Sequence, residues 1–160
     1  MNRIGVWLAL ALLTSFSTGC NSFGRQPRLD HAAIVPASLK PGDSAVITVK
    51  VIDKRKIIKR VVGVVQEDPR MKFPLRDDGV APDKKASDGV WSLQVDVPPL
   101  APPGQFTLAL TAFGSKGDAI VVRKTKDETG PLSATCTLLI EYPPEEPQGA
   151  EAPEAAAPPG

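Results

Sequence analysis

The chain has 160 residues, of which 19 are basic and 18 acidic, and its formal net charge is +1. This length is typical of a single domain. The balanced charge excludes a broad nucleic-acid-binding surface, which requires a strong excess of basic residues.

The first nineteen residues have the pattern of an export signal. Arg3 provides a positive charge, and an apolar run at residues 4–13 follows it. This run is about half the length of a membrane-spanning helix. Small residues then lead directly into Cys20, as they do before a signal-peptidase site. The pattern indicates a segment that directs the protein out of the cytoplasm.

The end of this segment resembles the signal of bacterial lipoproteins, in which a lipobox ends at a cysteine. The resemblance rests on Thr18, Gly19 and Cys20 behind the apolar run, and Ser17 stands where the family prefers leucine. It implies that the Cys20 thiol carries a diacylglyceryl group and anchors the protein to a membrane. Two alternatives remain open: cleavage by the general signal peptidase, which would release a secreted protein, and an uncut anchor.

The resemblance also divides the chain and places it in the cell. It implies that residues 1–19 are a cleaved signal peptide and that residues 20–29 are a lipidated tether. Members of the family reside in the cell envelope, where an aspartate directly after the cysteine retains them at the inner membrane. Here that position is Asn21. The outer membrane is therefore expected in preference to the outer face of the inner membrane.

Residues 30–142 form a region in which apolar and polar residues alternate in several segments. A period of two is typical of half-buried strands, and turn sequences rich in glycine, proline and aspartate separate the segments. The expected strands lie within residues 32–35, 45–51, 57–65, 91–97, 106–112, 119–122 and 134–140. The pattern predicts an all-β domain, a β-sandwich of about seven strands.

Three residues of these strands are expected in the core. Trp91 and Phe106 belong to the apolar faces of their strands, and Cys136 alternates with polar neighbours on the face of Ala134 and Leu138. If Cys20 is lipidated, Cys136 has no cysteine with which to pair, so a small buried hydrophobic residue is its expected role. A reactive thiol is the alternative, but no histidine or basic residue adjoins it in sequence to lower its pKa.

Two motifs resemble those of bacterial immunoglobulin-like domains. The first is D-D-G at residues 77–79, then Asp83, then D-G-V-W at residues 88–91, and the second is P-G-Q-F at residues 103–106. The resemblance implies an immunoglobulin-like β-sandwich exposed on the envelope, often accessory to larger surface proteins. It implies no single activity.

Four carboxylates, Asp77, Asp78, Asp83 and Asp88, lie in what is expected to be an acidic hairpin at residues 77–88. Calcium takes six to eight oxygen ligands, which carboxylates and backbone carbonyls of such a segment could supply. The alternative is that each side chain accepts local backbone N–H groups and shapes the connection. The spacing is not that of an EF-hand, and two lysines lie in the middle of the segment, which favours the second interpretation.

The remaining charged and polar segments are expected at the surface. Five basic residues between positions 54 and 60 are interpreted as the solvated tip of a hairpin, with contact to lipid headgroups or an anionic polymer as the alternative. Residues 143–160 contain only proline, glutamate, alanine, glycine and one glutamine. Such a segment buries too little apolar surface to offset the entropy of ordering, so a disordered tail is expected.

The sequence lacks the usual elements of an enzyme. Its single histidine, His31, lies at the start of the domain, and there is no glycine-rich phosphate loop, Cys/His metal cluster or Gly-x-Ser-x-Gly motif. We therefore expect no enzymatic activity and no cofactor apart from the calcium considered above. The expected function is a binding or structural module for an envelope protein or glycan. The alternative is a calcium-dependent adhesion or carbohydrate-binding module that uses the acidic hairpin.

Overall fold

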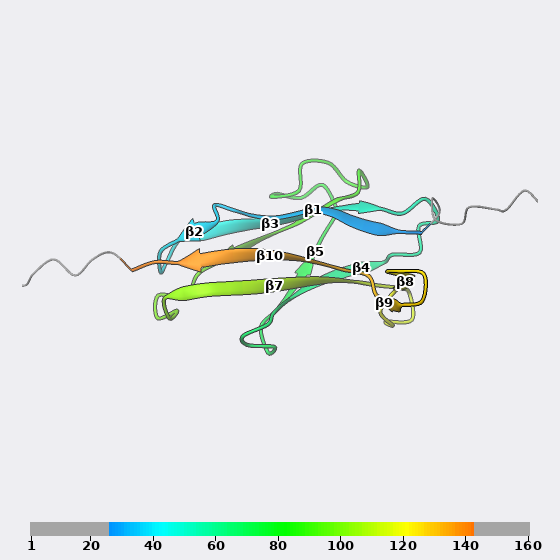
Figure 1. Cartoon of the computed structure of the whole chain (residues 1–160). Helices are drawn as coiled ribbons and strands as arrows, with labels where there is room; N and C mark the ends of the chain where they lie inside the picture. Colours follow the sequence, from blue (N-terminus) through cyan, green and yellow to red (C-terminus); the bar gives the residue numbers. More distant parts are fainter. Residues whose placement is uncertain (1–25, 143–160) are drawn as a thin grey trace, which may run out of the picture.

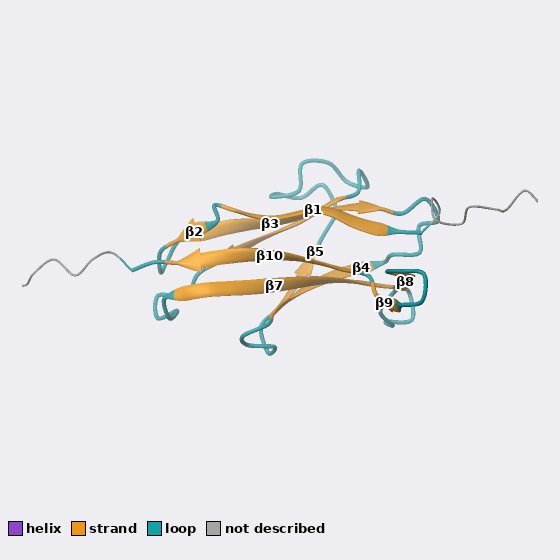
Figure 2. Cartoon of the chain, in the orientation of Figure 1, coloured by secondary structure: helices purple, strands orange, loops and turns teal. Residues whose placement is uncertain are grey.

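The computed structural model describes residues 26–142. Within this range the chain forms ten β-strands and no helix (Figure 2), which confirms the all-β prediction. The predicted signal peptide 1–19, the predicted lipidation site Cys20 and the predicted tail 143–160 lie outside the described residues. No helix long and apolar enough to cross a membrane occurs among the residues described.

Seven of the ten strands have four or more residues, and the other three are short. In chain order the strands are β1 (Arg28–Val35), β2 (Ser38–Leu39), β3 (Ser44–Ile52), β4 (Arg60–Val65), β5 (Lys72–Leu75), β6 (Val90–Asp96), β7 (Gly104–Phe113), β8 (Val121–Arg123), β9 (Thr129–Pro131) and β10 (Ser133–Ile140).

These strands form two main sheets. The first sheet has the order β1-β3-β6 and the second has the order β2-β10-β7-β4-β5, while β8 and β9 form a separate pair. Figure 1 shows the two sheets as two layers, with the start of β1 and the β8–β9 pair at one end and the end of β10 at the other. Neighbouring strands are antiparallel, except that β2 and β10 are parallel.

The core lies between the two sheets and follows the alternation of the sequence. On β3, Ala45, Ile47 and Val49 are buried while the residues between them are half-buried. From the other sheet, Val61 on β4 and Leu110 on β7 are fully buried. Successive side chains of a strand point to opposite faces, so one residue in two enters the core.

The first strand begins earlier than the sequence predicts. Arg28 pairs with Ile52 and Leu29 pairs with Val51, although both Arg28 and Leu29 fall in the segment predicted as tether. The run at residues 57–65 becomes a strand only at Arg60.

Strand β5 is absent from the sequence prediction because Pro74 lies within it. Proline has no N–H to donate to a sheet and is confined to edge strands and bulges. β5 is the edge of the second sheet and pairs only with β4 there, with Pro74 opposite Val62. One side of its backbone is thus free of the ladder, which accommodates the proline.

The two predicted hairpins are connections between the layers. Residues 53–59 join β3 of the first sheet to β4 of the second, and residues 76–89 join β5 of the second sheet to β6 of the first. The strands on either side of each segment therefore belong to different sheets. Turn residues and alternation mark the ends of strands, but they carry no information on which sheet the next strand joins.

Candidate functional site

The acidic loop, residues 77–89, is held at both ends by backbone hydrogen bonds. Arg76 and Ser92 exchange a pair of N–H···O bonds of 2.9 and 2.8 Å just outside the loop. At its far end the Val51 N–H of β3 donates to the Gly89 carbonyl at 2.7 Å, and the Lys50 ammonium donates to the Asp88 carbonyl at 2.6 Å. The loop is therefore docked on β3 of the first sheet.

Hydrogen bonds to the side chain of Asp77 join the two ends of the loop, and the side chain of Asp88 stabilises the turn at the second end. The two carboxylate oxygens of Asp77 accept the N–H groups of Asp88 and Gly89 at 3.2 and 3.1 Å. The carboxylate of Asp88 accepts the N–H of Val90, two residues further on, at 2.7 Å. Bonds of this second kind form Asx-turns, in which an aspartate stabilises the turn that follows it.

Asp83 is the buried carboxylate of the loop, with 6 % of its surface exposed. One oxygen accepts the N–H of Gly79 at 2.6 Å and the other accepts the N–H of Lys85 at 3.2 Å. A buried carboxylate is tolerated only when hydrogen bonds replace the lost water, and here two backbone donors do so. Asp83 therefore determines the path of the chain through the loop.

Three of the four predicted carboxylates converge. Asp77, Asp83 and Asp88 each offer an oxygen, and these oxygens lie within 4.8 Å of one another. Asp78 is not part of this group; its carboxylate accepts the Val80 N–H at 3.0 Å and lies 4.0 Å from the Arg76 guanidinium. With one oxygen each, the three carboxylates supply half or fewer of the six to eight oxygens that calcium takes, so a cation there would also need further oxygen ligands.

The residues predicted for the core lie at or beside it. Cys136 on β10 is buried, and burial raises the pKa of its thiol. Trp91 and Phe106 are half-buried and pack against the core. Raising the pKa lowers the fraction of the nucleophilic thiolate, so the environment of Cys136 suits packing rather than reactivity.

His31 is exposed and lies at an irregularity in β1. Asp30 pairs with Lys50 and Ala33 with Thr48, so His31 and its neighbour stand opposite the single residue Val49. The φ angle of His31 is 53°, a left-handed conformation that histidine adopts more often than most residues. The bulge in β1 therefore accounts for the left-handed backbone conformation of His31.

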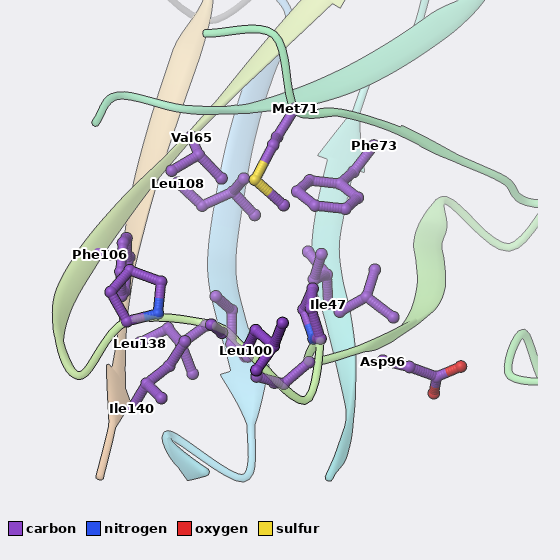
Figure 3. Close-up of a pocket in the computed structure, with 16 residues that line it drawn as sticks. Ile47, Val65, Met71, Phe73, Asp96, Leu100, Phe106, Leu108, Leu138 and Ile140 are labelled. Carbon is purple, nitrogen blue, oxygen red and sulfur yellow. The ribbon is translucent and has the colours of Figure 1, made fainter. Parts of the chain in front are cut away.

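An apolar cavity of about 300 Å³ between the two sheets was not anticipated from the sequence. Figure 3 shows Met71, Phe73, Leu108 and Phe106 around it, while the carboxylate of Asp96 is directed away. Asp96 accepts a hydrogen bond from the Ser44 hydroxyl at 2.6 Å instead. The alternation pattern assigns such side chains to a core but does not reveal how tightly the two layers close on each other.

Comparison with known proteins identifies no family for the chain. No protein-family model and no curated protein sequence matches the chain. An endo-beta-1,4-mannanase from Thermotoga petrophila is 10% identical with a TM-score of 0.45, over 74% of this chain and 20% of the mannanase. An alkylpurine DNA glycosylase from Pseudomonas fluorescens, bound to DNA containing an abasic site analog, is 11% identical with a TM-score of 0.40, over 75% of this chain and 32% of the glycosylase. The chain thus spans a minor part of either structure, and neither similarity supports an inference.

Proposed function

We propose that the protein is a lipoprotein of the cell envelope, anchored through Cys20, whose β-domain is a non-catalytic binding or structural module for another envelope component. The observation that carries the proposal is the order of features at the amino terminus. A basic residue, a short apolar run and small residues lead into Cys20, and a folded domain begins at Arg28. By resemblance to the lipoprotein family, the outer membrane is the proposed destination.

The short distance between anchor and domain supports a role close to the membrane. Seven residues separate Cys20 from Arg28, and a fully extended chain of that length spans at most about 25 Å. Two or three acyl chains make release from the membrane negligible, because each buried methylene contributes about 0.8 kcal/mol. A partner of the domain is therefore expected within the same narrow layer above the membrane.

We further propose that the domain is immunoglobulin-like. In that fold strands B and E are neighbours in one sheet and strands C, F and G are neighbours in the other. Here β3 and β6 are neighbours in the first sheet, and β4, β7 and β10 are neighbours in the second. The disulfide between the sheets of antibody domains has no counterpart within residues 26–142, whose only cysteine is Cys136.

The anchor is tested with two cysteine variants of the full chain. Cys20→Ala is expected to move the protein into the aqueous phase of a detergent that separates on warming, while Cys136→Ala, the matched control, stays in the detergent phase. Mass spectrometry of the amino terminus should find an acylated cysteine in the unaltered chain. An unmodified amino-terminal peptide, or aqueous partitioning of the unaltered chain, contradicts the proposal.

The partner is sought by cross-linking in intact membranes. Recovery of one envelope protein in a fixed ratio to the chain, with or without a chelator, supports a binding or structural module. Retention on glycan that a chelator abolishes supports the second candidate below.

The second candidate is a calcium-dependent adhesion or carbohydrate-binding module. The observation that favours it is the convergence of carboxylate oxygens from Asp77, Asp83 and Asp88 within 4.8 Å. Thermal unfolding of the full chain in millimolar calcium and in a chelator tests it. A ligand at a thousandfold excess over its dissociation constant stabilises a protein by about 4 kcal/mol. Identical unfolding curves contradict this candidate.

A further inference from the structure

The amino-terminal end of the domain brings together three segments that are far apart in sequence. β1 enters the first sheet with Arg28 opposite Ile52, the last residue of β3. The side-chain oxygen of Gln26 accepts the Arg123 N–H of β8 at 2.8 Å. The start of the described residues therefore lies beside the end of β3 and beside β8, at the end shown at the right of Figure 1.

The loop after β3 lies against the segment after β7 at this same end. The Lys59 N–H donates to the Phe113 carbonyl at 2.8 Å, and the Arg60 guanidinium stacks over the Phe113 ring at 5.1 Å. Lys56, Lys59 and Lys116 line one open hollow between the two segments, together with Asp118. Three lysines and one aspartate thus border a common surface, which we name the basic end.

Apolar side chains are exposed on the basic end as well. Ile57 is 39 % exposed and Val121 is 64 % exposed, and both border the hollow that the three lysines line. Basic residues mixed with exposed apolar residues are characteristic of surfaces that lie in the interface of a membrane with anionic lipids.

Hydrogen bonds within the loop after β3 hold its exposed side chains in a defined position. Asp53 accepts the N–H groups of Arg55 and Ile58 at 3.1 and 2.7 Å. This holds the loop in a compact turn with Ile58 buried and its neighbours exposed. The carboxylate of Asp53 is thereby engaged within the turn, close to the backbone and not with the lysines.

We propose that the basic end rests on the anionic phospholipid headgroups of the membrane that holds the anchor. The inference rests on the proposed anchor at Cys20 and deepens it, because it states which face of the domain meets the membrane. An anchor on a short tether keeps this face within reach of the headgroups, and each lysine or arginine near an anionic surface contributes attraction that falls off within about 10 Å. The opposite end, where β10 finishes, is then left free for a partner.

The test measures the exposure of individual lysines in the full chain, reconstituted in nanodiscs of phosphatidylglycerol or of phosphatidylcholine. A lysine-acetylating reagent is applied briefly and modification of each lysine is read by mass spectrometry. Lys56, Lys59 and Lys116 are expected to react about fivefold more slowly in phosphatidylglycerol, because the headgroups screen them, and high salt should abolish the difference. Lys40 and Lys72, exposed and outside the basic end, are the internal controls and should react alike in both lipids.

Charge reversal completes the test. Lys56→Glu combined with Lys59→Glu is expected to abolish the protection of Lys116, whereas Lys40→Glu combined with Lys72→Glu leaves it intact. Equal reactivity of all five lysines in both lipids overturns the inference. Slow reaction of Lys56, Lys59 and Lys116 relative to Lys40 and Lys72 in phosphatidylcholine, or in phosphatidylglycerol at high salt, also overturns it. A steric effect of the tether and not charge would then be responsible. The same spectra report acylation of Cys20, so failure of the anchor is distinguished from failure of the headgroup contact.

Discussion

Gly89 and Val51 approach each other so closely that a side chain at position 89 would force the backbone to shift. The Val51 N–H donates to the Gly89 carbonyl at 2.7 Å, and a Cβ on Gly89 would lie 2.8 Å from the Val51 carbonyl oxygen. Gly89 also has a φ of 82°, which side chains disfavour. The contact fixes the end of the acidic loop against β3.

Gly89→Ala is therefore expected to destabilise the domain by about 2–4 kcal/mol, from backbone strain and from the clash with Val51. Gly42→Ala is the matched control, because Gly42 has a similar φ of 88° but nothing within 4 Å of an added Cβ. It should cost only about 1–2 kcal/mol, the strain of the left-handed conformation. Urea unfolding of both variants measures the two losses, and equal losses contradict the proposed contact.

Asp83 is expected to stabilise the acidic loop without any metal. In Asp83→Asn the amide can accept only one of the N–H groups of Gly79 and Lys85, and the other donor loses its partner in this part-buried loop, at a cost of about 1–2 kcal/mol. The exposed Asp78 accepts one local N–H, so Asp78→Asn should change stability by no more than about 0.5 kcal/mol. Unfolding measured in a chelator should give the same difference. A loss for Asp83→Asn that appears only in the presence of calcium would instead support the second candidate function.

The strands that the sequence reveals best are those with one side in the core. In β3 and β10 the alternation of residues such as Ile47 with Thr48, or Cys136 with Thr137, follows directly from the pleat of a strand that is buried on one face. β5 escapes this reasoning because Pro74 is tolerated only by virtue of its edge position. That position depends on the whole sheet and cannot be read from four residues.

The acidic loop is likewise predicted only in part from the sequence. Aspartate beside glycine predicts local turns. The Asx-type bonds in which the Val80 N–H donates to Asp78 and the Val90 N–H donates to Asp88 are of that kind. The bonds of Asp77 to residues eleven and twelve positions later, and the burial of Asp83, depend on how the loop crosses between the sheets. The sequence carries no local signal for such a crossing. The basic end is hidden from sequence reasoning for the same reason, since Lys56 and Lys116 are sixty residues apart.

The thiol of Cys136 should be protected in the folded protein. Burial raises its pKa above the ordinary value of 9.0, so the thiolate that reacts with alkylating reagents is scarce and shielded. Alkylation at pH 8 is expected to be slow in native buffer and fast in urea, with modification located by mass spectrometry.

The raised pKa of the Cys136 thiol also makes the stability of the domain depend on pH. Because the folded-state pKa is the higher one, the contribution of the neutral thiol to stability is present below the unfolded pKa and is lost as pH rises through the folded pKa. Cys136→Ala should remove this alkaline loss, and rapid native alkylation would contradict the buried position.

Glu67 provides an acid-sensitive contact at the end of β4. Both of its carboxylate oxygens lie 3.0 Å from the Thr107 nitrogen, and the hydrogen bond from the Thr107 N–H lowers the pKa of Glu67 below 4.5. A depressed folded-state pKa gives stabilisation that is present above the unfolded pKa and disappears as pH falls through the folded pKa. Glu67→Gln should therefore differ from the unaltered chain in its urea midpoint at pH about 6 more than at pH about 3. Asp68 is kept as aspartate in both proteins. Its hydrogen bond with the Arg70 side chain also lowers its pKa, so replacing it would add a second acid-sensitive change. An NMR titration in which the Glu67 carboxyl shows no lowered pKa would contradict the contact with Thr107.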